Sequence, residues 1–140
     1  MVKQHIKLTV DAVVFSVIEE QLKILLIQRK NEPFKGMWAL PGGFVEDNED
    51  LEPAMRRELE EETGLKIKTA TQLGAYGKPG RDPRGHTVTI AYHMLIDEKH
   101  SHLKGGDDAA DAKWFNIHHL PEIAFDHADI IADGLKQLPS

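Results

Sequence analysis

Apolar and polar side chains alternate along much of the chain, and this period of two predicts strands. Between residues 5 and 18, apolar residues take every second position, with Lys7, Thr9 and Asp11 on the opposite face. Residues 22–28 are apolar on both faces, which is typical of a strand inside a sheet. Further stretches with strand character are residues 38–40, 66–76, 86–96 and 112–116.

Two segments instead repeat their apolar residues with the period of a helix. The first begins after Asp50, a good N-terminal cap, and ends near Thr63, where Gly64 is a good C-terminal cap. The second covers about residues 127–138, and Asp126 precedes it as a candidate cap. Strands outnumber helices, so the predicted class is α+β with a mixed sheet.

The first helix turns acidic side chains toward its apolar face. Its apolar stripe consists of Leu51, Met55 and Leu59. At about 100° per residue, Glu58 and Glu62 fall inside that stripe and Glu61 lies at its edge. A buried carboxylate is costly unless a cation accompanies it, either an arginine such as Arg57 or a divalent ion. Helical projection alone equally allows that these glutamates are ordinary surface acids.

Composition narrows the choice of cation. The chain has no cysteine, which excludes disulfides and thiolate metal sites. The net charge is −6, and residues 42–62 hold nine acids opposed only by Arg56 and Arg57. Such an oxygen-only cluster favours a hard cation, Mg²⁺ or in its place Mn²⁺, and disfavours nucleic acid. With no membrane-spanning run or signal peptide, we predict one cytoplasmic domain, residues 1–140, without a membrane or nucleic-acid partner.

Residues 43–65 read GFVEDNEDLEPAMRRELEEETGL and resemble the Nudix box at every defined position. Those positions are Gly43, Glu49, Arg57, Glu58, Leu59, Glu61, Glu62, Gly64 and Leu65. Nine matches at fixed spacing are far more specific than a short motif. The resemblance therefore favours a functional role for the inward glutamates over the surface-acid interpretation.

The resemblance to the Nudix family implies a fold and a metal site. The implied fold is a mixed β-sheet sandwiched between helices, an α/β/α sandwich, with the box forming a loop–helix–loop. The implied ligands of the divalent ion are Glu58, Glu61, Glu62 and the backbone carbonyl of Gly42. The base would be Glu58 or Glu61, since members of the family differ on this point. Glu49 and Arg57 would hold the loop against the helix.

Segments outside the box resemble the branch of the family that hydrolyses ADP-ribose to AMP and ribose 5-phosphate. This resemblance rests on residues 74–86, which include Pro79, and on residues 38–43 and 124–128. The implied reaction uses divalent ions to neutralise the diphosphate and activate water, and a carboxylate to accept the proton. The expected partner is a small nucleotide diphosphate.

Four residues are candidates for contacting this substrate: Arg29, Arg81, Arg84 and Trp38. Guanidinium groups suit phosphate and ribose oxygens, but a solvated turn is an equal alternative for the two arginines at 81 and 84. Trp38, like Phe34 and Tyr76, could stack on adenine or belong to the core. An acid of the loop 105–111 could serve as a further ligand or base, or the loop could simply be solvated.

Two alternatives remain open at this point. One is a Nudix hydrolase of another nucleoside diphosphate conjugate or of a damaged nucleoside triphosphate. The other is a domain that senses ADP-ribose without hydrolysing it. Sensors of that kind carry a DNA-binding domain, and we expect none after the last helix. Homodimers are common in this branch, so the resemblance leaves a homodimer open.

Overall fold

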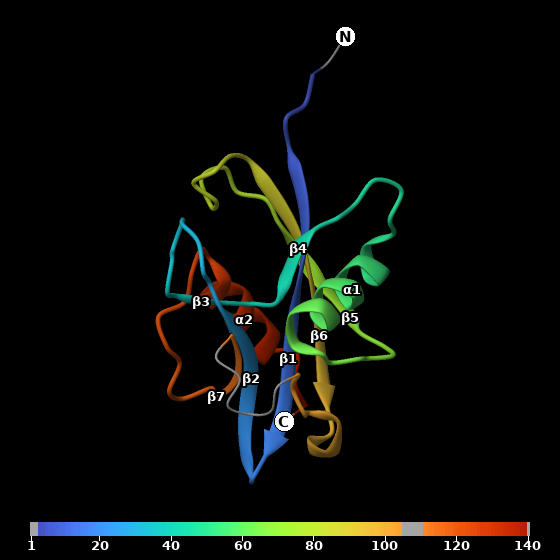
Figure 1. Cartoon of the computed structure of the whole chain (residues 1–140), viewed down its shortest axis with the longest axis vertical. Helices are drawn as coiled ribbons and strands as arrows, with labels where there is room; N and C mark the ends of the chain where they lie inside the picture. The colour runs from blue at the N-terminus through green and yellow to red at the C-terminus, as the bar shows by residue number, and fades with distance from the viewer. Residues whose placement is uncertain (1–2, 105–110, 140) are drawn as a thin grey trace.

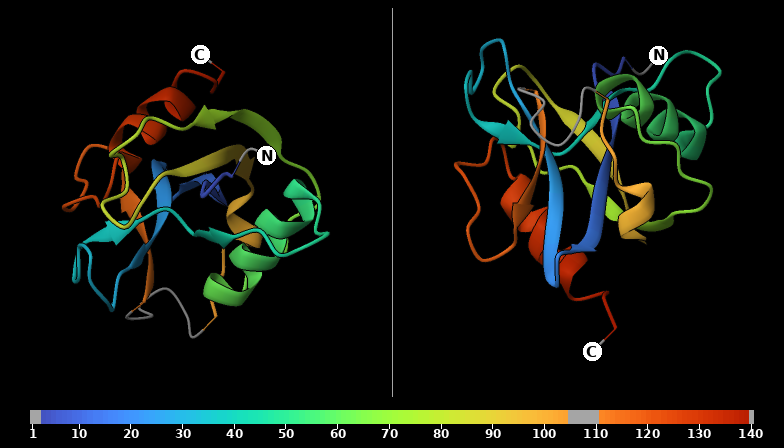
Figure 2. Two further views of the ribbon diagram at one scale, coloured as in Figure 1. Left: turned by 90° about the horizontal axis from the view of Figure 1, so that it is seen from above. Right: turned by 60° about the horizontal axis from the view of Figure 1, so that its bottom comes forward.

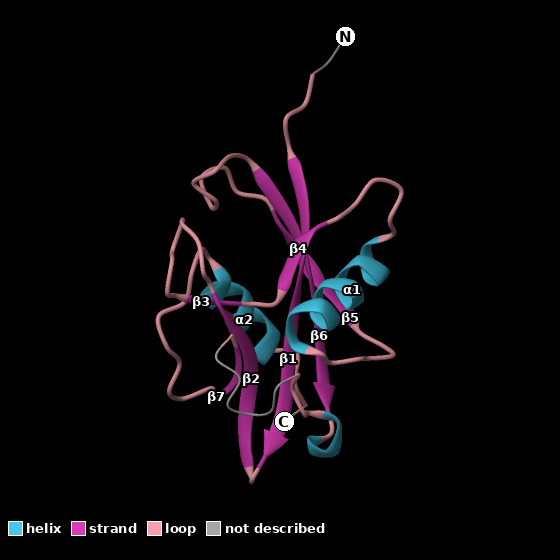
Figure 3. Ribbon diagram, in the orientation of Figure 1, coloured by secondary structure: helices cyan, strands magenta, loops and turns pink. Residues whose placement is uncertain are grey.

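Seven strands and two α-helices make up the part of the chain that the computed structural model describes, residues 3–104 and 111–139 (Figure 1). The strands are β1 (Lys7–Ile18), β2 (Gln21–Gln28), β3 (Trp38–Ala39), β4 (Gly42–Phe44), β5 (Thr71–Tyr76), β6 (Thr87–Ile96) and β7 (Ala112–Asn116). The helices are α1 (Leu51–Thr63), α2 (His127–Leu135) and the short 3₁₀ helix η1 (Glu98–His100), and Figure 3 distinguishes them from the strands.

The strand β1 lies at the centre of one mixed sheet. Along one edge it pairs in parallel with β6, from Lys7 to Ser16. Its other edge is divided: β4 pairs antiparallel with residues 9–11, and β2 pairs antiparallel with residues 15–18. The remaining strands extend the sheet, because β3 and β7 pair with β2 and β5 pairs with β6. The division of this edge separates β4 from β2, and the candidate site forms between them.

The two α-helices cover opposite faces of the sheet (Figure 2). Alternate residues of β1 explain this arrangement, because successive side chains of a strand point to opposite faces. Val10, Ala12 and Val14 join a core cluster with Met55 and other residues of α1. A second cluster, on the α2 side, contains Val13, Phe15, Ile24, Leu26, Leu40, Ala91, Ile130 and Ile131. The α/β/α sandwich predicted from the sequence is therefore confirmed.

Helix α1 has the boundaries that its capping residues predict. The Asp50 carboxylate accepts a hydrogen bond from the Leu51 N–H at the first turn. At the other end, Gly64 adopts a left-handed conformation with φ 81°, and its N–H donates to the Glu60 carbonyl. This conformation suits glycine because it has no Cβ. The helix thus stops directly after the acidic residues of the box.

Several local predictions differ from the structure. Strand β5 begins at Thr71 rather than residue 66, and α2 ends at Leu135 rather than residue 138. The Asp126 side chain does not cap α2, because both of its oxygens accept hydrogen bonds from Arg81. The strand β4 and the helix η1 were not predicted. Within the described ranges, neither α-helix has the length and apolar character needed to cross a membrane.

Candidate active site

The acidic face of α1 packs against β4, as the helical projection predicts. The Glu58 side chain is 16% exposed, whereas that of Glu61 is 59% exposed. Glu62 accepts a hydrogen bond at Oε1 from the Gly42 N–H, at 2.8 Å. A Cβ atom at Gly43 would lie 2.6 Å from the Glu58 carboxyl carbon, so only glycine allows this close approach. The glycines of β4 therefore form a cradle for two carboxylates.

Arg57 ties the loop before α1 to the helix. Its Nε and Nη2 donate to the two carboxylate oxygens of Glu49, at 2.7 and 2.9 Å. The same side chain donates to Glu58 at 2.9 Å and to the Phe44 carbonyl at 3.2 Å. The hydrogen bonds from Arg57 lower the pKa of Glu49 to about 2. This geometry agrees with the structural role that the resemblance implies for the ion pair.

The site carries more negative charge than its own cations neutralise. Burial raises the pKa of Glu62 to about 8, and the nearby carboxylates of Glu58, Asp11 and Glu61 act in the same direction. Burial also raises the pKa of Glu58, although Arg57 opposes this shift. An oxygen-only donor set with excess charge, held against two glycines, fits a hard divalent cation. Among the described residues no three acidic or histidine side chains already converge on one point, so such an ion would draw the glutamates together.

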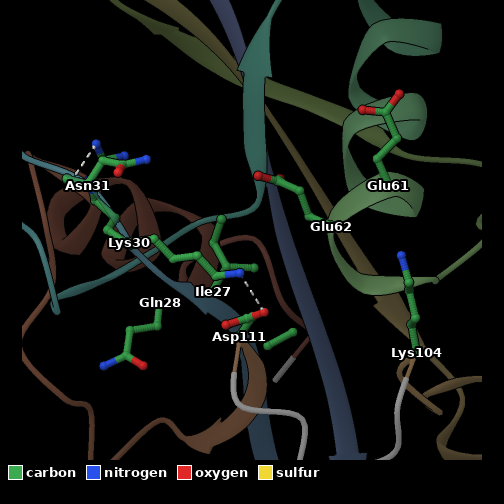
Figure 4. Close-up of a pocket in the computed structure, with 10 residues that line it drawn as sticks. Ile27, Gln28, Lys30, Asn31, Glu61, Glu62, Lys104 and Asp111 are labelled. Carbon is green, nitrogen blue, oxygen red and sulfur yellow. Dashed lines mark hydrogen bonds and ion pairs between the residues drawn. The ribbon is translucent and has the colours of Figure 1, made fainter.

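Two cavities meet at Glu62. The larger, of about 500 Å³, lies between Glu61 and Glu62 on one side and the end of β2 with Lys30 and Asn31 on the other (Figure 4). The smaller, of about 200 Å³, lies between β4 and Phe125. Ile27, Arg29 and Glu62 line both cavities. A ligand that occupies both spaces would therefore pass directly over the Glu62 carboxylate.

The wall opposite the glutamates is cationic. Arg29 and Arg84 lie over the Phe125 ring, with the guanidinium carbons 4.9 and 5.5 Å from its centroid. Arg29 is held by the Pro33 carbonyl at 2.7 Å, and Arg84 by the Asp82 carboxylate at 2.9 Å. Burial lowers the pKa of Arg29, and the charge of Arg84 lowers it further. A bound anion would relieve the repulsion between these two groups.

Comparison with known proteins agrees with this arrangement. Residues 7–134 match the NUDIX domain family, which is nearly the whole chain. The chain belongs to the Nudix family. It is 52% identical over 120 residues to a Methanocaldococcus jannaschii protein named ADP-ribose pyrophosphatase, covering 86% of this chain and 70% of that protein.

Another relative is named as a regulator, and a solved relative binds ADP-ribose. An Acinetobacter baylyi protein named as an ADPR-responsive transcriptional repressor is 38% identical over 94% of this chain, which spans 54% of that repressor. The Nudix domain of Shewanella oneidensis NrtR, solved with ADP-ribose, superposes with a TM-score of 0.86 at 35% identity. That match covers 98% of this chain and 91% of the solved chain. The family is therefore shown, but it contains both a named hydrolase and a named repressor.

The structure brings only part of the predicted Nudix substrate site together. Arg29 and Arg84 line the smaller cavity. Arg81 also lines it, but its side chain is 5% exposed, and its Nε and Nη2 donate to the Asp126 carboxylate at 2.9 and 2.7 Å. Trp38 packs edge-to-face on Phe115 at 4.8 Å against the second core cluster, and lines neither cavity. Substrate contact by Arg81 or Trp38 stays a prediction, and each already has a structural partner.

The loop predicted to offer a further acid is described only at its edges. Residues 105–110 lie outside the described residues. At the far edge, Asp111 forms an ion pair with Lys30 at 3.0 Å. At the near edge, Lys104 lines the larger cavity below Glu61 and Glu62 (Figure 4). Its backbone N–H donates to the Thr63 carbonyl, which fixes it to the end of α1.

Sequence reasoning missed a buried polar group beneath the Nudix glutamates. Asp11, on the α2 face of β1, is 6% exposed and accepts a 2.6 Å hydrogen bond from the Thr89 hydroxyl. His127, the first residue of α2, is also 6% exposed, and its Nε2 lies 3.7 Å from the Asp11 carboxylate. The available signal was an aspartate inside an otherwise apolar stretch of β1. Its partners lie more than 75 residues away in the sequence, so no local motif joins them.

Proposed function

We propose that the chain hydrolyses the diphosphate linkage of ADP-ribose with a divalent ion, giving AMP and ribose 5-phosphate. The observation that carries this proposal is the position of Glu62. This half-buried carboxylate lies where two cavities meet, between a cradle of glycines and a cationic wall. The name of the relative from Methanocaldococcus jannaschii supports ADP-ribose as the substrate.

Glu58, Glu61 and Glu62 would hold the divalent ion, with the Gly42 carbonyl as a further oxygen, except that whichever of Glu58 and Glu61 serves as the base is not a ligand. Mg²⁺ is the expected ion, and Mn²⁺ is a suitable substitute, because all of these donors are oxygens. When bound, the ion neutralises phosphate oxygens and lowers the pKa of a water molecule. The Arg57 contact with Glu58 orients one ligand, and the Gly42 N–H orients Glu62.

Glu61 is the better placed of the two candidate bases. Glu58 is held on one side by Arg57 and on the other by Gly43, so its carboxylate is confined. The Glu61 side chain lines the larger cavity and is more than half exposed, and Arg57 contacts it only at 3.5 Å. A carboxylate with access to solvent can accept a proton from the attacking water and pass it on.

Cavity shape and charge suit a dinucleotide-like diphosphate. The larger cavity offers polar groups on Gln28, Lys30 and Asn31, which suit the hydroxyls of a ribose. The smaller cavity offers Arg29 and Arg84, whose planar guanidinium groups suit phosphate oxygens. The diphosphate would then cross between the two spaces at Glu62.

Incubation with ADP-ribose and Mg²⁺, followed by chromatography of AMP, tests this proposal directly. EDTA should abolish AMP formation and added Mg²⁺ should restore it. A panel of other nucleoside diphosphate conjugates and oxidised nucleoside triphosphates distinguishes another Nudix substrate. If ADP-ribose binds but is never consumed, the chain is a sensor like its repressor relative, and the hydrolase proposal is wrong.

The substitution Glu61→Gln tests the role of the base. It should lower kcat by about 100-fold or more, because it removes general-base catalysis while keeping the shape of the side chain. Glu60→Gln is the matched control, since Glu60 is an exposed neighbour on the same helix. Both variants should melt within a few degrees of the wild type. Near-normal kcat in Glu61→Gln would remove Glu61 from the mechanism.

A further inference from the structure

Three consecutive residues, the two that connect β3 to β4 and the first residue of β4, are each anchored to a different element. The Leu40 N–H donates to Nδ1 of His127 in α2, at 3.0 Å. The Pro41 carbonyl accepts from the Ala12 N–H of β1, at 2.8 Å. The Gly42 N–H donates to Glu62 of α1, at 2.8 Å. The segment 40–42 therefore connects α2 mechanically to a carboxylate of the proposed ion site.

The first of these anchors depends on one ring nitrogen. Because Nδ1 of His127 accepts a hydrogen bond, the neutral ring carries its proton on Nε2. That nitrogen faces the Asp11 carboxylate at 3.7 Å, which is too long for a hydrogen bond but orients the ring by charge. Asp11 is itself fixed by the Thr89 hydroxyl. Burial lowers the pKa of His127, in keeping with the neutral form.

Asp11 also lies directly beneath β4. A Cβ atom at Gly42 would collide with Oδ1 of Asp11 and with the Val10 carbonyl. Gly42 and Asp11 are register partners in the antiparallel pairing of β4 with β1. Asp11 and His127 thus contact the segment 40–42 on the α2 side of the sheet, and Glu62 of α1 accepts the hydrogen bond from Gly42.

We propose that His127 is a positioning residue for the divalent-ion site, acting through the Leu40 N–H and the segment 40–42 on Glu62. This inference rests on the ion site of the proposed function. A buried N–H that loses its acceptor is destabilising and drives the backbone to rearrange. Pro41 and Gly42 follow Leu40 directly. A rearrangement at Leu40 therefore displaces the Gly42 N–H, which orients Glu62.

Three substitutions separate this role from simple packing. His127→Asn keeps an acceptor near the position of Nδ1, and so keeps the bond from Leu40. His127→Gln reaches toward Asp11 but leaves the Leu40 N–H without an acceptor, and His127→Leu removes both polar contacts. Mn²⁺ affinity, measured on the full chain by electron paramagnetic resonance without ADP-ribose, is the readout. Thermal melting confirms which variants are folded.

We expect His127→Gln and His127→Leu to weaken Mn²⁺ binding about 10-fold, as loss of a support behind a metal ligand typically does. His127→Asn should stay close to the wild type. If the Asn and Gln variants bind Mn²⁺ equally well, the positioning role is wrong, and this comparison decides the matter even if His127→Leu does not fold. ADP-ribose hydrolysis by the wild type is assayed separately. If the wild type does not hydrolyse ADP-ribose, the proposed substrate is wrong. The order of Mn²⁺ affinities among the variants still tests the positioning role of His127.

Discussion

The single residues that matter most are glycines and acids in direct contact. Gly43 lies against the carboxylate of Glu58, and Gly42 donates its N–H to Glu62. Neither glycine has the positive φ that usually explains a glycine, so steric access is the reason for its presence. The acids are held close to the backbone because the side chains that would separate them are missing.

Gly43→Ala should therefore impair the site more than the fold. The added methyl group would lie 2.6 Å from the Glu58 carboxyl group, so that side chain must move. We expect kcat/KM and Mg²⁺ affinity to fall about 10-fold or more, as misplacement of catalytic groups by about 1 Å commonly does. Gly74→Ala is the control, because a Cβ there meets nothing within 4 Å. Equal activity of the two variants in a steady-state assay would contradict this account.

At the scale of elements, helix α1 was predictable because its signals are local. Asp50 and Gly64 adjoin the helix and set its ends, and the inward position of Glu58 follows from the period of 3.6 residues. The Arg57–Glu49 pair was likewise predicted from the box and is present. Caps and ion pairs between residues close in the sequence form in this way wherever the apolar stripe of α1 is buried.

Other elements were not predictable, because tertiary contacts decide them. Asp126 is a good cap by residue type, but the buried Arg81 binds it more strongly than the helix end does. Gly42 and Gly43 have low strand propensity, and they form β4 only because β1 offers a free edge. The Asp11–His127 contact joins residues at opposite ends of the chain, which no spacing rule could reveal.

Gly64→Ala tests the end of α1 as an element. A left-handed conformation costs a residue with a Cβ about 1–2 kcal/mol. The new methyl group would also lie 2.6 Å from the Cβ of Lys104. We expect a melting temperature lower by roughly 2–4 °C per kcal/mol lost, the shift typical of domains of about this size. Differential scanning calorimetry beside Gly74→Ala measures this, and an unchanged melting temperature would mean that the helix end can relax.

At the scale of the whole molecule, the charge distribution argues against DNA binding. The chain has a net charge of −6. Phosphate contacts made by Lys and Arg supply most non-specific DNA affinity. We expect duplex DNA to bind more weakly than about 10⁻⁴ M at physiological salt, the weak limit for DNA-binding proteins. Fluorescence anisotropy measures this. Tighter, salt-dependent binding would instead favour a regulator like the repressor relative.

The contribution of Glu62 to the stability of the metal-free protein should fall as the pH rises. Burial raises the pKa of Glu62 from an ordinary value of 4.5 to about 8. Between these values Glu62 binds its proton more fully in the folded than in the unfolded chain, so its contribution to the free energy of unfolding decreases with increasing pH. The lowered pKa of His127 acts in the opposite direction below its ordinary value of 6.5, and this contribution is common to the wild type and to variants at Glu62. Below pH 4.5 and above about pH 8, Glu62 does not change the free energy of unfolding with pH. Thermal melts in EDTA at several pH values within this interval measure the effect.

Glu62→Gln provides the decisive comparison. The amide cannot ionise but can still accept the hydrogen bond from the Gly42 N–H, so its melting temperature in EDTA should vary less with pH. Saturating Mg²⁺ should reverse the trend in the wild type only, because the ion binds the deprotonated carboxylate and stabilises the folded state. Identical pH profiles for the two proteins in EDTA would mean that Glu62 is already ionised without metal. Its burial would then need a cation from the protein itself, and the argument for a divalent ion at this position would lose its electrostatic basis.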